Sequence, residues 1–145
     1  MDRHAPVCSL TRVRIQQSVL DEIVAHARED KPNECCGLIG GRDDVATTAY
    51  RTRNEFASPM RFNIHPSDLF QVQMRQIPDA GEELVAMYHS HPVSEAAPSQ
   101  TDINLSENIP GLIWLICSLQ NPDEPVVRAF SIADNAAQEL ELAVV

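Results

Sequence analysis

The chain has 145 residues, which is the usual length of one domain, and a formal net charge of −10. Its eleven basic residues are scattered among 21 acidic ones, so we expect no phosphate-binding surface and no nucleic-acid partner. The longest apolar stretch, 112–117, is far shorter than the roughly 20 residues that cross a bilayer, so we expect no membrane partner either.

The first third of the chain predicts an amphipathic helix between strands. A short strand is expected over 8–15, and a helix over 17–30, with Ser18 as its N-cap. The apolar face of this helix consists of Val19, Leu20, Ile23, Val24 and Ala27. Residues 34–40 and 45–52 are strand-like, and the turn sequence GRDD between them predicts a hairpin.

The rest of the chain continues this alternation. Helices are expected over 66–77 and 99–109, the first with apolar contacts from Leu69, Phe70, Met74 and Ile77. Strands are expected over 82–91, 112–119, 126–132 and 138–145. Strands interleaved with three helices predict an α/β fold, in which a mixed β-sheet is flanked by helices, and we expect residues 1–145 to form one domain.

The stretch YHSHPVSEAAPSQTD (88–102) predicts a metal site. Side chains at positions i and i+2 of a strand point to the same face, so His89 and His91 project together. Zinc binds imidazole and carboxylate, and catalytic zinc commonly takes three protein ligands, which makes Asp102 the natural third ligand. Pro92 and Pro98 stiffen the intervening segment, because each restricts the residue before it.

A purely structural interpretation of the same residues stays open. Ser99 and Asp102 have the spacing of a capping box at the start of a helix, with serine at the N-cap and an acid three residues later. An isolated pair such as His89 and His91 is more often part of the core or the surface than of a metal site. The combination of the histidines, the proline-bounded loop and the Ser–Asp pair favours a metal site over these alternatives.

These residues resemble the signature of the JAMM (MPN+) metallopeptidases. In that family a glutamate precedes H-[S/T]-H, which is followed by seven residues and S-x-x-D. The present chain has Glu34, then His89-Ser90-His91, seven residues, Ser99 and Asp102. The resemblance implies an MPN fold, a cytidine-deaminase-like α-β-α arrangement. It is closest in kind to the small stand-alone prokaryotic members, because no recognition domain is appended.

The resemblance also implies roles for individual residues. His89, His91 and Asp102 would bind one catalytic Zn²⁺. Glu34 would be the general base and then the general acid, and Ser99 would stabilise the oxyanion. Ser90, the middle residue of the motif, would support the site. From the residues alone, Glu34 would be interpreted only as a solvated acid before a strand.

The activity that the resemblance implies is that of a zinc metallopeptidase. The bond cleaved would be a peptide or isopeptide bond after the C-terminal Gly-Gly of a ubiquitin-like or sulfur-carrier protein, for example with release of cysteine. Segments 53–65 and 92–98 are candidates for contact with that tail, although Arg61, Phe62 and His65 receive no role. The alternatives are a non-catalytic MPN-type interaction module and a purely structural zinc site.

The cysteines and the N-terminus predict the cellular location. The four cysteines form no C-x-x-C pair, which is typical of reduced, mostly buried thiols: Cys8, Cys35, Cys36 and Cys117. The N-terminal sequence MDRHAPVCSL has no apolar core of the kind that a secretory signal needs. We therefore expect a cytoplasmic protein.

Overall fold

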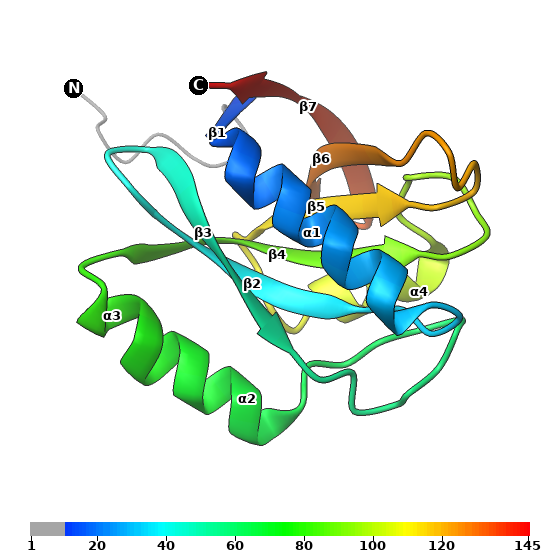
Figure 1. Cartoon of the computed structure of the whole chain (residues 1–145), viewed down its shortest axis with the longest axis horizontal. Coiled ribbons are helices and arrows are strands. Elements are labelled where there is room, and N and C mark those ends of the chain that lie inside the picture. Colours follow the sequence, from blue (N-terminus) through cyan, green and yellow to red (C-terminus); the bar gives the residue numbers. More distant parts are fainter. Residues whose placement is uncertain (1–10) are drawn as a thin grey trace.

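The structure, a computed structural model, describes residues 11–145 (Figure 1). The first elements are β1 (Arg12–Ile15), α1 (Gln17–Asp30), β2 (Cys36–Arg42) and β3 (Val45–Thr52). They are followed by α2 (Pro66–Gln71), the π-helical segment η2 (Val72–Gln76), α3 (Ile77–Asp79) and β4 (Glu83–His91). The last are α4 (Gln100–Ser106), β5 (Ile113–Ser118), β6 (Val126–Ala133) and β7 (Ala136–Val144). No helix within residues 11–145 is long and apolar enough to span a membrane.

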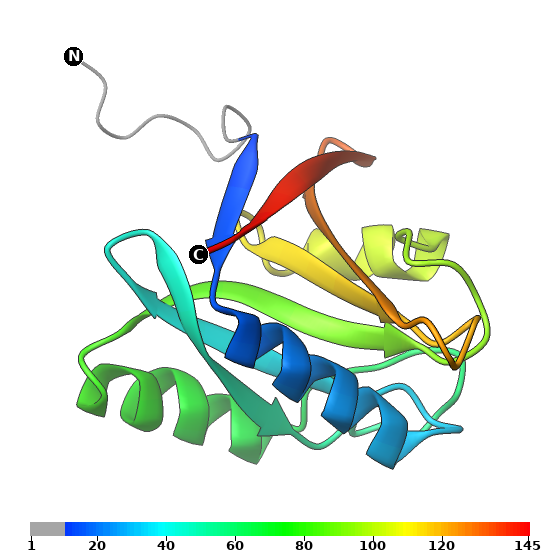
Figure 2. The same ribbon diagram turned by 45° about the horizontal axis from the view of Figure 1, so that its top comes forward.

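The strands form one mixed sheet in the order β1-β3-β2-β4-β5-β6-β7. Strand β4 lies in the middle, antiparallel to β2 and parallel to β5. The sheet closes into a barrel because β1 pairs in parallel with both β7 and β3, and Figure 2 shows β1 beside β7 at this closure. The predicted mixed sheet with flanking helices is confirmed, and its closure goes beyond the prediction.

The two faces of the sheet are covered by different helices. Helix α1 packs on one face through Val19, Ile23 and Ala27. The other face packs against residues of α2, η2 and α4. Successive side chains of β4 point to opposite faces, so Tyr88 lies on the α1 face while His89 contacts aromatic rings on the other.

The bounds of α1 agree with the prediction, but its N-cap residue does not. The helix begins at Gln17, and Gln16 is the N-cap residue, with an extended backbone and a carbonyl that accepts the Val19 N–H. The prediction that Ser18 caps the helix is therefore wrong. At the other end Lys31 is extended, as expected for a residue before proline, and the helix stops there. Residues 8–10 of the predicted first strand lie outside the described residues.

The helix predicted over 66–77 is interrupted by a change of helical period. In a π-helical turn, residues five apart share a face, so Val72 and Ile77 both point into the core, with exposed fractions of 3% and 2%. Phe70 and Met74 are 49% and 61% exposed, so their predicted apolar contacts with the core are wrong. A pattern based on 3.6 residues per turn cannot anticipate this shift.

The π-helical turn predicts a large loss of stability for one substitution in η2 and a small one for another. Val72→Ala should lower the free energy of unfolding by about 1.5–3 kcal/mol, because it removes buried methyl groups and leaves a cavity. Met74→Ala should change it by less than about 0.5 kcal/mol, because its side chain is mostly in water. Urea denaturation of both variants tests this. A larger loss in Met74→Ala would indicate a regular α-helix with Met74 in the core.

Candidate metal centre

Three buried side chains from β4 and the first turn of α4 meet at one point. The Nε2 atoms of His89 and His91 and Oδ2 of Asp102 lie 3.1 Å from one another. All three residues are buried, and they form a cluster able to hold a metal ion. Ligand atoms of a tetrahedral zinc ion with bonds of about 2.0–2.1 Å lie about 3.3–3.4 Å apart, so this triangle fits zinc and leaves one position open.

Neighbouring groups orient the two rings differently. The Nδ1 atom of His91 lies 2.8 Å from the Glu95 carbonyl oxygen, so we assign the ring proton to Nδ1, which leaves the Nε2 lone pair facing the cluster. The ring of His89 is held by packing instead. It stacks on Phe62 with the centroids 4.3 Å apart, and Trp114 meets it edge-on at 5.7 Å. Within residues 11–145, Nδ1 of His89 has no hydrogen-bond partner.

The pKa values of the three cluster side chains favour a cation bound between them. Burial lowers the pKa of His89, which keeps its ring neutral. Burial would also lower the pKa of His91, but hydrogen bonds to Asp102 and to the Glu95 carbonyl outweigh it and raise the pKa. Burial alone would raise the pKa of Asp102, but the two histidines and the Ser99 N–H lower it. An ionised carboxylate facing two imidazole nitrogens needs a positive charge between them, which a proton or a metal ion can supply.

Asp102 is also part of the capping box of α4. Its Oδ2 accepts the Ser99 N–H at 3.0 Å, and its own N–H donates to Ser99 Oγ at 3.1 Å. The two interpretations of these residues therefore hold together, since the same carboxylate oxygen caps the helix and faces the histidines. Ser99 is exposed, and because its Oγ accepts a hydrogen bond from Asp102, its hydroxyl hydrogen stays available to another acceptor.

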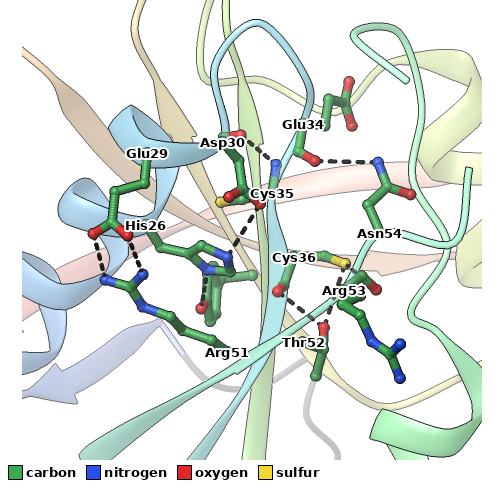
Figure 3. Close-up of polar contacts among 12 residues, drawn as sticks. His26, Glu29, Asp30, Glu34, Cys35, Cys36, Arg51, Thr52, Arg53 and Asn54 are labelled. Carbon is green, nitrogen blue, oxygen red and sulfur yellow. Dashed lines mark hydrogen bonds and ion pairs between the residues drawn. The ribbon is translucent and has the colours of Figure 1, made fainter. Parts of the chain in front are cut away.

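Glu34 lies just before β2, and its side chain is only 5% exposed. Its N–H donates to the Ser58 carbonyl at 2.9 Å, and its carbonyl accepts from the Asn54 amide at 3.1 Å (Figure 3). Burial raises the pKa of its carboxyl to about 8, and the nearby charge of His91 acts against that rise. A carboxyl tuned to this range can take and return protons near neutral pH.

Ser90 joins the histidine strand to the segment that carries Glu34. Its Oγ accepts the N–H of Cys35 at 2.8 Å, and its own N–H donates to the Cys35 carbonyl at 3.1 Å. Next along the ladder, Cys36 pairs with His89. The structure therefore brings the sequence-predicted residues Glu34, Ser90 and the three ligands together, through backbone pairing that spans more than fifty residues of chain.

Two aromatic residues of the site were not predicted from the sequence. Phe62, from a loop, and Trp114, from β5, contact the His89 ring. Neither stands at a spacing from the predicted ligands that would mark it as a site residue. An aromatic residue in an apolar stretch is normally part of a core, as these two also are. No pattern in the chain distinguishes them from other core residues.

The cysteines beside the site are structural. Cys35, Cys36 and Cys117 are free and buried, as predicted, and Cys8 lies outside the described residues. Burial raises the pKa of the Cys36 thiol to about 12 and that of Cys117 to about 11, and it also raises that of Cys35. A thiol that resists ionisation is a poor nucleophile and a poor metal ligand.

Comparison with known proteins places the chain among prokaryotic relatives. The family model described as prokaryotic homologs of the JAB domain matches residues 16–133. A CysO-cysteine peptidase of Mycobacterium tuberculosis is 32% identical over 127 residues, which are 86% of this chain and 86% of that protein. A desampylase of Haloferax volcanii is 35% identical over 115 residues, 74% of this chain and 81% of that one. A JAB1/MPN domain protein of Archaeoglobus fulgidus shares the fold, with a TM-score of 0.61 at 20% identity over 92% of this chain and 96% of that one.

The double use of Asp102 predicts that two substitutions separate its roles. Asp102→Ala removes the oxygen that caps α4 and should lower the free energy of unfolding in the presence of a chelator by about 0.5–2 kcal/mol. Asp102→Asn keeps an oxygen that can accept the Ser99 N–H and should lose less stability. Both should weaken zinc binding at least tenfold, which a competition titration with a chromogenic chelator measures. Zinc affinity of Asp102→Asn equal to that of the unchanged protein would leave Asp102 with the capping role alone.

Proposed function

The chain belongs to the prokaryotic JAB-domain family and is a hydrolase of the JAMM type, and on that premise we propose that it is a zinc-dependent metallopeptidase. The bond it hydrolyses is a peptide or isopeptide bond after the C-terminal Gly-Gly of a ubiquitin-like or sulfur-carrier protein. One observation carries the proposal. Three ligand atoms at mutual distances of 3.1 Å lie beside a buried glutamate whose pKa is about 8.

His89, His91 and Asp102 would hold the metal. Their donor set, two imidazole nitrogens and one carboxylate oxygen, suits zinc, and the buried, oriented rings present lone pairs to a common point. When bound there, zinc makes a water molecule more acidic, with a pKa near 7, and polarises a carbonyl group. A purely structural site closes all four positions with protein ligands, whereas three are offered within residues 11–145.

Glu34 and Ser99 would handle the proton and the developing negative charge. The Glu34 carboxylate takes a proton from the attacking water, whose oxygen forms a bond to the carbonyl carbon. It then delivers that proton to the amine nitrogen as the carbon–nitrogen bond breaks. The Ser99 hydroxyl donates its hydrogen to the carbonyl oxygen as that oxygen becomes negative. The Asp102 N–H donates to a lone pair of Ser99 Oγ, and this leaves the hydroxyl hydrogen available to the substrate carbonyl.

The relatives support the substrate class. The Mycobacterium tuberculosis protein is named for peptidase action on CysO-cysteine, and the Haloferax volcanii protein is named a desampylase, so both names point to carrier proteins of the ubiquitin-like kind. The loops next to the site are the candidates for contact with an extended tail. Segment 53–65 contacts the main chain of Glu34, and segment 92–98 contains Glu95, whose carbonyl orients His91.

Glu34→Gln tests the assigned base. The substitution keeps the shape of the side chain and removes its ability to accept a proton. The variant should fold, bind zinc with unchanged affinity and lose at least about 10²-fold in kcat on Gly-Gly-tailed carriers, since general acid–base catalysis contributes about 10²–10⁴-fold. Mass spectrometry of the products and zinc quantification measure both properties. Cleavage at a near-normal rate would remove Glu34 from the mechanism.

Metal removal tests the peptidase against the alternative of a non-catalytic interaction module. Chelator-treated protein should lose cleavage and recover it with one equivalent of zinc. Zinc should also raise the melting temperature, because a ligand at 100 times its Kd stabilises the folded state by about 2.7 kcal/mol. Calorimetry at several zinc concentrations checks this independently of activity. A protein that neither binds zinc nor melts at a higher temperature with it would be the interaction module.

A further inference from the structure

The direction of the Glu34 carboxyl is set by its main chain. Its Oε1 atom is buried and has no hydrogen-bond partner within residues 11–145. The backbone of the same residue is bonded on both sides, through its N–H to Ser58 and through its carbonyl to Asn54. Figure 3 shows the Asn54 amide pointing at this carbonyl while the Glu34 carboxyl points away from it. Because no hydrogen bond within these residues holds Oε1, the position of the carboxyl depends on how the backbone of Glu34 is held.

The side chain of Asn54 uses its full hydrogen-bonding capacity. Its Nδ2 donates to the carbonyls of Glu34 and Arg61 at 3.1 and 3.0 Å. Its Oδ1 accepts the N–H groups of Phe56 and Asn63 at 3.0 and 3.1 Å. Two donors and two acceptor lone pairs are all that an amide side chain offers. Asn54 thus organises the 54–63 loop internally and spends one donor on the residue proposed as the base.

The same loop also reaches a proposed metal ligand. Phe62, near its far end, stacks on the ring of His89. The loop is closed by an isolated bridge between Asn54 and Ile64, so its two ends move together. One loop therefore contacts the proposed base through Asn54 and Ser58 and a proposed ligand through Phe62. The separation of base and metal depends on this loop as well as on the sheet.

We propose that Asn54 is a positioning residue, which sets the place of the Glu34 carboxyl relative to the metal ligands through the Asn54 Nδ2–Glu34 carbonyl hydrogen bond. This inference rests on the proposed role of Glu34 as general base. In this role Asn54 contacts neither the substrate nor the metal ligands directly. Because misplacement of a catalytic group by about 1 Å can lower a rate about 10²-fold, the loss of one such bond should be visible in turnover.

Asn54→Asp removes both donors of the amide. The substitution keeps the size of the side chain and both acceptor positions for Phe56 and Asn63, but it replaces the donor to the Glu34 and Arg61 carbonyls with a second acceptor. Asn121→Asp is the matched control. Asn121 lies in the exposed β5–β6 loop, where its Oδ1 also accepts a backbone N–H and its Nδ2 donates to Glu124, so the same substitution adds the same charge outside the 54–63 loop. Asn54→Ser shortens the side chain so that it no longer reaches the Glu34 carbonyl and adds no charge, although it also loses the bonds to Phe56 and Asn63, and it serves if Asn54→Asp does not fold.

Three measurements on the zinc-loaded full chain test the proposal. In Asn54→Asp we expect kcat on Gly-Gly-tailed carriers to fall about 10–100-fold, with KM within about threefold and zinc affinity unchanged. Amide hydrogen exchange at Glu34, whose N–H donates to Ser58 of the same loop, should become at least about tenfold faster, because the loop opens more often without the Asn54 donors. Asn121→Asp should change none of them. A purely structural loss would lower zinc binding along with kcat, and that result would overturn the positioning role.

Other outcomes are equally decisive. A raised KM with an unchanged kcat would make Asn54 a substrate contact, and a kcat equal to that of Asn121→Asp would remove it from the site. If the unchanged protein cleaves no Gly-Gly-tailed carrier, the proposed function fails. The exchange rate at Glu34 then still decides whether Asn54 holds its backbone, since it is measured without substrate.

Discussion

The arrangement of the site depends on one carboxylate oxygen, Oδ2 of Asp102. It contacts Nε2 of both histidines and the N–H of Ser99, so the end of β4 and the start of α4 are held at one point. A buried carboxylate is unfavourable unless its charge is balanced. The Ser99 N–H supplies one hydrogen bond, and a cation between the carboxylate and the two imidazoles would supply the rest. The loop between His91 and Ser99 contributes as well, because the Glu95 carbonyl within it orients the His91 ring.

The placement of Glu34 depends on a second constraint, the pairing of β2 with β4. The ladder aligns Cys36 with His89, and the side chain of Ser90 adds a bond to Cys35. Ser90 faces away from the histidines on the strand and is therefore free to bind backbone. The alternation along β4 thus places two histidines in the candidate metal site and lets the residue between them bind the neighbouring strand.

The sequence predicts those parts of the site whose residues are close together in the chain. His89, His91 and Asp102 follow from strand alternation, a proline-bounded loop and the chemistry of zinc ligands. Glu34 is separated from them by more than fifty residues, and only the family resemblance singles it out. Asn54 and Phe62 carry no signal at all, since each acts through a contact that exists only after the chain has folded.

The fold likewise divides into features that local sequence predicts and features that it does not. Mixed strands and flanking helices follow from local pattern, and the hairpin of β2 and β3 from its turn. Closure of the sheet by β1 joins residues from the two ends of the described chain, so local sequence patterns cannot predict it. The π-helical turn at Val72–Gln76 is also invisible, because five-residue spacing of apolar side chains is decided by the surface they pack against.

The strict alternation along β4 has a consequence for how the chain could misfold. A slip of one residue against β2 would rotate the whole strand and present Tyr88 and Ser90 where the imidazoles now stand. Such a species would retain most of its strand pairing and its overall compactness, yet it would have no site. If the site binds zinc as proposed, metal uptake during refolding would report strand register, because only the native alignment presents both imidazoles to one ion. The ion would then shift the population toward that alignment.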